Sequence, residues 1–170
     1  GVSPAGQMRR SINYYIERER ARPYKPFLNA NTWFDIGYYT PYDESAAVDA
    51  ISQYAASLTK KRGLPLDAYL LDDGWDDPAG LWKTDGRFPG GLKPVAKAAG
   101  RLGGALGVWL SLTGGYGEAR DRRLAAGARL GLETTAEGFA VSGPNCYRYF
   151  SDLCLDMLRN NRYGPALTLR

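Results

Sequence analysis

Two short apolar runs, each closed by acidic residues or by glycines, constrain the fold more than any other feature of the sequence. Residues 68–71 lead directly into Asp72 and Asp73, and residues 106–112 lead into a pair of glycines. Apolar runs of this length, without alternating polar residues, are typical of strands buried on both faces, as in a parallel sheet. The sequence therefore predicts two buried strands here.

Helical and strand patterns alternate along the rest of the chain. Apolar residues at helical spacing predict helices over 5–20, 45–61, 92–102, 118–130 and 145–161. Further strands are predicted over 27–34 and 166–169, whereas 134–141 fits neither pattern. Strands that alternate with helices indicate an α/β fold with parallel pairing and right-handed crossovers, here in a single domain over 1–170.

Composition and charge exclude several classes of protein. The hydrophobic content of 44% and the charged content of 24% are typical of a soluble globular domain. No apolar run approaches the roughly 18 residues of a membrane span, and no signal peptide is recognisable, so we expect a soluble, cytoplasmic chain and no membrane partner. The net charge of +4 comes from scattered residues, with short basic runs at 9–10, 60–62 and 120–123 that we interpret as solvated helix faces. We therefore expect no nucleic-acid partner.

The sequence contains no histidine, which excludes histidine-based triads and histidine metal sites. Acid–base chemistry would have to come from carboxylates, Tyr, Lys or Cys. Cys146 and Cys154 would lie about 12 Å apart on a helix, too far for a disulfide, so we expect buried thiols. No metal and no organic cofactor is expected.

Aromatic and acidic residues gather where the predicted strands end. The tryptophans are Trp33, Trp75, Trp82 and Trp109, and the acidic residues are Asp35, Asp72, Asp73, Asp76, Asp77 and Asp85. Ligands of parallel α/β folds bind at the carboxyl ends of the strands. Aromatic faces match the C–H faces of a sugar, and carboxylates accept hydrogen bonds from its hydroxyls, which indicates a carbohydrate site. The alternative is that the tryptophans pack loops and the aspartates cap helices.

Asp72 and Asp73 form the most informative pair. Adjacent residues of a strand point in opposite directions, so one carboxylate can face the sheet interior and the other a neighbouring loop. Two carboxylates this close raise each other's pKa unless hydroxyls or cations satisfy them. The alternative is that one caps a helix and the other is solvated.

Three segments carry a family resemblance: Leu-Leu-Asp-Asp-Gly-Trp at 70–75, Leu-Trp-Lys-Thr-Asp at 81–85 and Phe-Pro-Gly-Gly-Leu at 88–92. Together they resemble the Asp-Asp-Gly-Trp strand end, the Trp-x-x-Asp element and the Phe-Pro-x-Gly-Leu segment of glycoside hydrolase families 27 and 36, the α-galactosidase type. Residues 26–33 look like the first barrel strand of these families, and 107–110 look like the third. The resemblance covers roughly residues 25–163.

The resemblance implies the N-terminal half of a TIM-type (β/α) barrel. It would contain about four parallel strands with helices between them, in one half-barrel domain with an N-terminal helix in 1–24 and β/α units in 25–170. Four strands do not close a barrel, whereas about eight do. Because an open sheet leaves unpaired edges, we expect a homo-oligomer that covers them.

The resemblance also implies a retaining α-glycosidase that takes galactose-like sugars. The residues matched by Asp72 and Asp73 bind sugar hydroxyls there, typically O4 and O6, and the position of Trp82 lies in a loop that flanks the sugar. The nucleophile of these families sits in a Lys-x-Asp element after the fourth strand, and residues 163–170 contain no counterpart. Their acid/base residue has no counterpart either.

The sequence therefore supports two functional hypotheses. The first is a glycoside hydrolase that cleaves O-glycosidic bonds by carboxylate chemistry, with Asp73 and Asp72 as its catalytic candidates. The second is a catalytically inactive carbohydrate-binding or self-assembling half-barrel. In both, the expected partner is a carbohydrate, and its candidate binding residues are Asp72, Asp73, Trp75, Trp82, Trp33, Asp35, Trp109 and Asp85. A phosphate-binding barrel is a weaker third hypothesis, because the glycine pairs lack a P-loop lysine pattern.

Overall fold

The computed structural model of the protein describes residues 2–21, 23–37, 40–160 and 168–169. Its centre is a parallel sheet of β1 (Asn29–Asn31), β2 (Ala68–Leu71) and β3 (Ala105–Leu110), in which each strand pairs with the next along the chain. The short segment β6 (Thr168–Leu169) pairs in parallel with the end of β3. The predicted α/β class with parallel strands is therefore confirmed.

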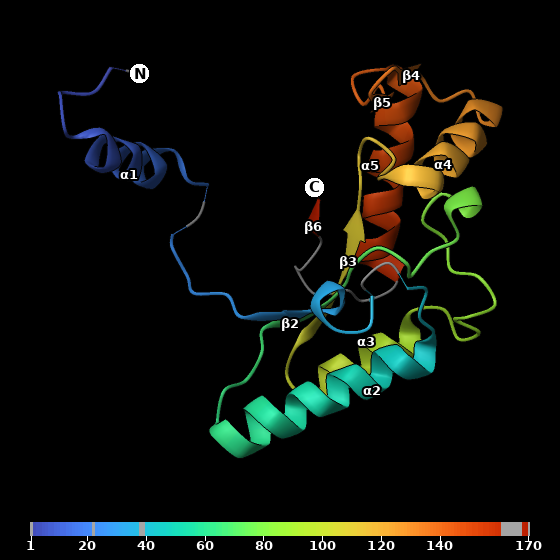
Figure 1. Ribbon diagram of the computed structural model, residues 1–170, viewed down its shortest axis with the longest axis horizontal. Coiled ribbons are helices and arrows are strands. Elements are labelled where there is room, and N and C mark those ends of the chain that lie inside the picture. The colour runs from blue at the N-terminus through green and yellow to red at the C-terminus, as the bar shows by residue number, and fades with distance from the viewer. Residues whose placement is uncertain (1, 22, 38–39, 161–167, 170) are drawn as a thin grey trace.

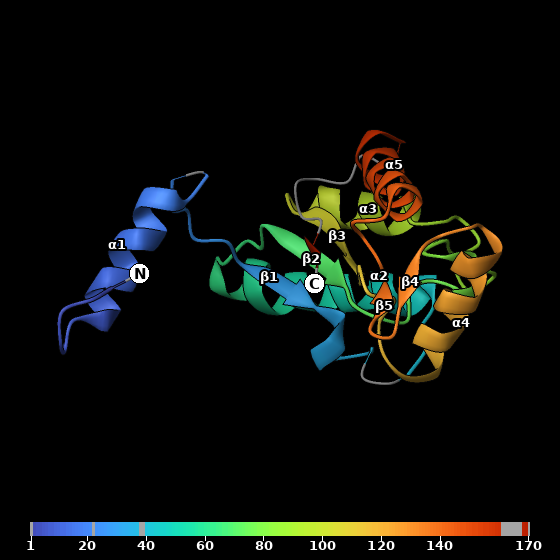
Figure 2. The ribbon, with the colours of Figure 1, turned by 90° about the horizontal axis from the view of Figure 1, so that it is seen from above.

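Helices pack on the sheet as two groups (Figure 1). α2 (Glu44–Tyr54) continues into a π-helical segment, η2 (Ala55–Lys60), and lies beside α3 (Lys93–Arg101). α4 (Gly117–Arg129) and α5 (Pro144–Asn160) lie at the other end of the fold. Each predicted helix is found within a few residues of its expected bounds. Figure 2 shows the same arrangement from above, with the strands drawn over α2.

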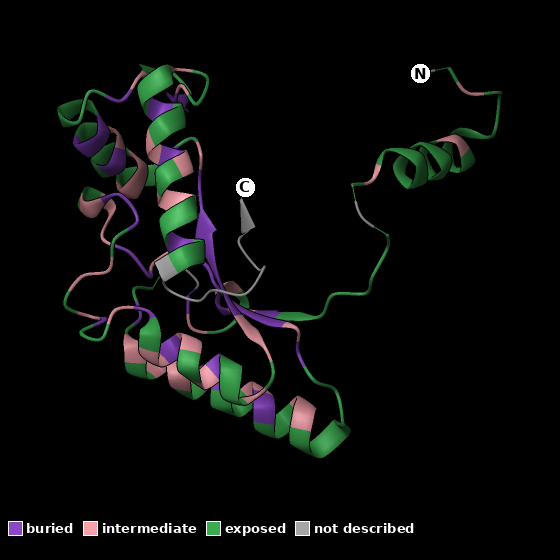
Figure 3. Cartoon of the chain, turned by 180° about the vertical axis from the view of Figure 1, so that it is seen from behind, coloured by how far each residue is buried: buried purple, intermediate pink, exposed green. Residues whose placement is uncertain are grey.

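The hydrophobic core forms around β2 and β3, as the apolar runs predict. All four residues of β2 are buried, and so are the last five of β3 (Figure 3). Leu71 and Val108 lie next to each other across the two strands, and both are nearly inaccessible. Val95 and Ala99 of α3 cover this core from the helical side.

The first strand is shorter than the sequence pattern predicted. A strand was expected over 27–34, but β1 contains only Asn29–Asn31, and a 3-10 helix, η1 (Thr32–Phe34), follows. The side chain of Asn31 accepts a hydrogen bond from the backbone N–H of Trp33 at 2.7 Å. This local bond replaces the strand ladder and turns the chain after Asn31.

Further observations concern the segment that fits neither pattern and the two ends of the described chain. Residues 134–141 contain an antiparallel hairpin of β4 (Thr134–Thr135) and β5 (Gly138–Phe139). The fourth strand was predicted over 166–169, and residues 166 and 167 lie outside the described part of the chain. Helix α1 (Met8–Glu19) lies apart from the rest in both ribbon views, and none of its residues is buried (Figures 1 and 2). No helix among the described residues is long and apolar enough to cross a membrane.

Candidate functional site

The carboxyl ends of β1, β2 and β3 meet at one edge of the sheet because the strands are parallel. Asn31 closes β1, Asp72 and Asp73 follow β2, and Ser111 follows β3. Ser111 accepts the backbone N–H of Gly115 at 2.8 Å and so shapes the turn beyond β3. This edge is where the sequence predicted a ligand site.

Asp72 is held rigidly by β1 and by the loop that follows it. Its carboxylate accepts hydrogen bonds from the Asn31 amide at 2.8 Å and from the backbone N–H of Asp73 at 2.8 Å. Its own backbone N–H donates to Thr32 Oγ1 at 2.9 Å, and its carbonyl accepts from the Tyr42 hydroxyl at 2.7 Å. Burial raises the pKa of Tyr42 far above its ordinary range, so this hydroxyl stays a donor.

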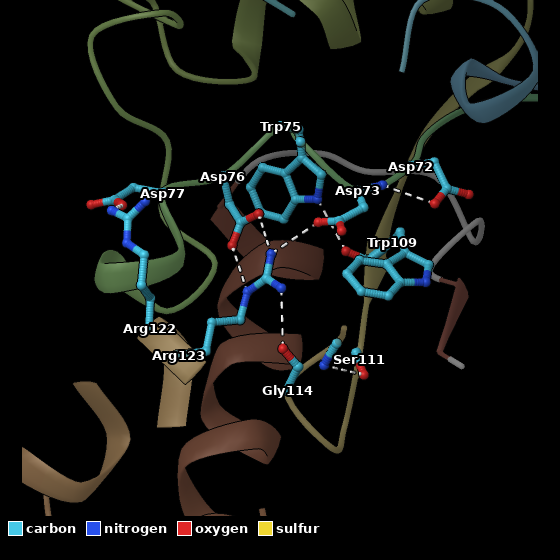
Figure 4. Close-up of polar contacts among 12 residues, drawn as sticks. Asp72, Asp73, Trp75, Asp76, Asp77, Trp109, Ser111, Gly114, Arg122 and Arg123 are labelled. Atoms are coloured by element: carbon cyan, nitrogen blue, oxygen red, sulfur yellow. Dashed lines mark hydrogen bonds and ion pairs between the residues drawn. The ribbon is translucent and has the colours of Figure 1, made fainter. Parts of the chain in front are cut away.

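Asp73 points the other way, towards α4 (Figure 4). Its Oδ1 accepts a hydrogen bond from Arg123 Nη2 at 3.1 Å, and its side chain is 26% exposed. The two adjacent carboxylates are therefore satisfied separately, Asp72 by amides and Asp73 by a guanidinium. Asp73 is the one that remains partly open to solvent.

Arg123 is fully buried and contacts two carboxylates and a backbone carbonyl. Nη2 donates to Asp76 Oδ1 at 2.8 Å, Nε lies 3.3 Å from Asp76 Oδ2, and Nη1 donates to the carbonyl of Gly114 at 3.1 Å. Burial raises the pKa of Asp76, and the charge of Arg123 opposes that shift. Asp76 is itself 1% exposed, so this carboxylate is a structural partner and cannot reach a substrate.

The glycine and tryptophan of the Asp-Asp-Gly-Trp segment have structural roles. Gly74 adopts a φ of +107°, a backbone conformation in which a residue with a Cβ would be strained. The Trp75 indole is buried and donates from Nε1 to the carbonyl of Trp109 at 3.0 Å. Trp75 therefore joins the loop after β2 to strand β3.

Trp82 lies in the hydrophobic core, although the resemblance implied a place in a loop flanking the sugar. Its side chain is 1% exposed, and its ring centroid lies 4.9 Å from that of Phe150 and 6.0 Å from that of Phe139. The Arg123 guanidinium lies 5.7 Å from the ring centroid of Trp82. The buried Trp82 indole therefore has no face open to a sugar.

Asp85 contacts the chain itself rather than the open edge. It binds the Arg87 guanidinium at 3.0 Å through both carboxylate oxygens, and this pairing lowers the pKa of Asp85. Arg87 also donates to the carbonyls of Gly74 and Asp76, at 2.6 Å and 3.0 Å. The Asp85–Arg87 pair thus holds the loop after β2 in place.

The remaining candidates differ in exposure. Trp33 is half-buried next to β1, and Asp35 is exposed beyond η1. Burial, and then the charge of Asp35, raise the pKa of Tyr54, which places Asp35 near α2. Trp109 is buried but stacks on Tyr116, with ring centroids 6.4 Å apart and planes at 27°. Tyr116 is 76% exposed, so it extends the aromatic surface at the end of β3.

No group of three or more Cys, Asp or Glu side chains within the described ranges is arranged to hold a metal ion. Both cysteines are free thiols; Cys146 is buried and Cys154 is partly buried. Asp76 and Asp77, which the sequence placed with the other acidic residues, are an Arg123 partner and an Arg122 partner respectively. At this edge, the described carboxylates meet arginines and amides.

Solved structures resemble this fold, whereas no protein-family model and no curated protein matches the sequence. An α-galactosidase from Thermus thermophilus, solved with p-nitrophenyl α-D-galactopyranoside, matches 88% of this chain with a TM-score of 0.64 and 17% identity. A glycoside hydrolase family 36 α-galactosidase from Geobacillus stearothermophilus matches 84% with a TM-score of 0.51 and 22% identity. The chain resembles these α-galactosidases in fold.

The resemblance to α-galactosidase-type barrels is therefore confirmed at the level of the fold, which is all that such identities show. The chain spans 32% of the length of the Thermus α-galactosidase and 20% of the Geobacillus α-galactosidase. A cycloalternan-forming enzyme from Listeria monocytogenes, solved with a pentasaccharide, matches 93% of this chain at a TM-score of 0.55 and 11% identity, over 18% of its own length. Enzymes of different activity thus share this arrangement, and the function must be argued from the site.

Sequence reasoning missed Arg123, which the structure places among the candidate residues. The basic run at 120–123 was interpreted as a solvated helix face, but Arg123 points inward between the Asp72-Asp73 strand end and the core. A signal was present: Arg123 precedes Ala126 and Gly127 by three and four residues, and both are buried. The inward face of the helix therefore includes Arg123.

Proposed function

We propose that this chain is part of a glycoside hydrolase-like protein that binds a galactose-like sugar at the carboxyl edge of its sheet. The observation that carries the proposal is the placement of Asp72 and Asp73 side by side at the end of β2, with Asp73 partly exposed. Charged carboxylates accept strong hydrogen bonds from hydroxyls. Of the aromatic residues near this edge, Trp33 is half-buried and Tyr116, which stacks on the buried Trp109, is 76% exposed, so these two can contact a ring.

The contacts favour binding over catalysis as the role of Asp72 and Asp73. Asp72 already accepts two hydrogen bonds, and Asp73 pairs with Arg123. A carboxylate that its donors hold in one orientation suits the recognition of hydroxyl groups. Hydrolysis by Asp73 and Asp72 themselves is the second proposal. Asp76, the nearest further carboxylate on the same loop, is buried against Arg123.

The test is a titration of the protein with methyl α-D-galactopyranoside and with methyl α-D-glucopyranoside. Calorimetry or ligand-observed NMR measures the binding. Loss of one hydrogen bond to a charged group costs about 1.5–3 kcal/mol, so Asp73→Asn should weaken galactoside binding about 10- to 150-fold. Asp77→Asn is the matched control, because Asp77 pairs with Arg122 and caps the short 3-10 helix η3 (Pro78–Gly80), a role that Asn keeps. Equal affinity of wild type and Asp73→Asn would refute the binding proposal.

Release of nitrophenol from p-nitrophenyl α-D-galactopyranoside separates the two roles. Turnover that Asp73→Asn or Asp72→Asn abolishes, at unchanged folded fraction, supports hydrolysis by these carboxylates. Binding without turnover at any pH supports the carbohydrate-binding role alone. Either result is interpretable because both substitutions preserve side-chain size.

We also propose that the sheet is part of a TIM-type (β/α) barrel with about four strands in this chain. Residues 25–170 would form the β/α units, and residues 1–24 would form a separate N-terminal helix. β1 lies at the edge of the described sheet, and exposed strand edges invite pairing with another chain. The proposed homo-oligomer is tested by the mass of the protein in solution, and a monomer at all concentrations would refute it.

A further inference from the structure

We propose that Arg123 is the positioning residue of the sugar site: it fixes the Asp73 carboxylate in the orientation that accepts hydroxyls. This inference rests on the proposed function and deepens it, because it identifies what makes Asp73 a preorganised acceptor. Arg123 lies on α4, fifty residues from Asp73 along the chain. Within the basic run 120–123, Arg123 is the residue that shares a buried helix face with Ala126 and Gly127, whereas its neighbour Arg122 is exposed.

The surroundings of the guanidinium leave it no alternative position. The side chain is 0% exposed, and its Cζ lies 5.7 Å and 5.6 Å from the ring centroids of Trp82 and Trp109. A Cβ on Gly115 would lie 2.7 Å from Nη1, so the glycine itself makes room for the guanidinium. The two aromatic rings, together with the hydrogen-bond acceptors at its edges that Figure 4 shows, fix the plane of the guanidinium.

Asp76 acts on the site through Arg123. Nη2 of Arg123 donates to Asp76 Oδ1 at 2.8 Å and to Asp73 Oδ1 at 3.1 Å. The bidentate contact with Asp76, made by Nη2 and Nε, holds the guanidinium in place. The second N–H group of Nη2 then points at Asp73. One buried positive charge thus serves two carboxylates, and only Asp73 reaches solvent.

The consequence for Asp73 is a single defined geometry. Oδ1 is occupied by Arg123, whereas Oδ2 has no hydrogen-bond partner within the described residues. With the side chain 26% exposed, Oδ2 is the oxygen available to a sugar hydroxyl. Lysine at position 123 would keep the charge but lacks the planar fork that reaches Asp76, Asp73 and Gly114 together.

The experiment compares the affinity for methyl α-D-galactopyranoside of wild type, Arg123→Lys, Asp76→Asn and Val95→Ala. Affinity is measured by titration and corrected for the folded fraction, so that a purely structural role would not change it. Val95 is fully buried in α3, outside the set of Arg123 partners, and its truncation lowers stability without altering the site. We expect a loss of about tenfold for Arg123→Lys, a smaller loss for Asp76→Asn, and less than a twofold change for Val95→Ala.

Each outcome decides between the inference and the proposed function. If wild type binds and the Arg123→Lys and Asp76→Asn variants bind within twofold of it, the role of Arg123 is overturned and the sugar site stands. If wild type does not bind, the proposed function fails and the inference fails with it.

A measurement on wild type keeps the inference testable if both variants fail to fold. The guanidinium ¹⁵N resonances of Arg123 should shift on addition of the galactoside, because Nη2 contacts the carboxylate that the sugar engages. Galactoside binding without any shift of these resonances overturns the role of Arg123.

Discussion

Replacing Arg123 with methionine should destabilise the protein by about 3–5 kcal/mol at pH 7, because it leaves a buried carboxylate without its charged partner. Both members of the Asp76–Arg123 pair have side chains that are 0% exposed, so water cannot replace the lost guanidinium. Methionine fills a similar length and removes only the charge and its donors. A loss of this size is a large fraction of the stability of a typical domain, about 5–15 kcal/mol.

The loss of stability in Arg123→Met should depend on pH, because Asp76 is titratable. Burial raises the pKa of Asp76 above its ordinary 3.8, so the folded state prefers the protonated carboxyl, and stability falls as pH rises through the folded pKa. Without Arg123 the two largest effects that oppose this shift, its charge and its hydrogen bonds, are lost, and the pKa of Asp76 rises further. The stability difference between wild type and Arg123→Met should therefore be largest near neutral pH and should shrink as pH falls towards 4.

Urea denaturation followed by tryptophan fluorescence measures the effect, since Trp75, Trp82 and Trp109 are all buried. The double variant Arg123→Met, Asp76→Asn removes both charges and should recover at least half of the lost stability. A loss below about 1 kcal/mol, or an equal loss at pH 4.5 and pH 7, would refute the reasoning.

Three further predictions concern packing and capping. Gly115→Ala should lower stability by about 1–3 kcal/mol in a urea titration, because Gly115 has a φ of +93° and its Cβ would meet Arg123; unchanged stability would contradict this. Trp82→Ala should cost about 3–5 kcal/mol, as for a core residue, and a loss below 1 kcal/mol would place this indole outside the core. Glu133 accepts the backbone N–H groups of Cys146 and Asn145 at the start of α5, and these bonds lower its pKa. The stabilising effect of Glu133 is thus present above pH 4.5 and is lost as pH falls through its lowered pKa. The melting temperatures of wild type and Glu133→Gln should therefore differ at pH 7 and converge in acid. A difference that does not change with pH would contradict the capping role.

The parts of the fold that local pattern determines were predictable from the sequence. The buried strands β2 and β3 follow from continuous apolar runs, and the placement of Asp72 and Asp73 follows from parallel pairing. The end of β1 was not predictable from hydrophobicity, because a single hydrogen bond that the Asn31 side chain accepts from the backbone N–H of Trp33 decides it. Local polar contacts override a strand pattern at such positions.

The roles of the tryptophans and of Arg123 depended on contacts that are distant in sequence. Trp82 is buried because Phe139 and Phe150 close over it, and both lie more than fifty residues away. In the sequence, an aromatic residue close to an aspartate looks the same whether it binds a sugar or packs a loop against the core. In the same way, Arg123 is distinguished from Arg122 by the direction of one helix face rather than by its neighbours.

A structure of the protein with methyl α-D-galactopyranoside would show whether the sugar binds at the carboxyl edge of the sheet. We expect sugar hydroxyls within hydrogen-bond distance of the Asp73 carboxylate at the end of β2, with the Arg123–Asp73 contact preserved. A sugar bound elsewhere on the chain, or bound at this edge without contact to Asp72 or Asp73, would contradict it.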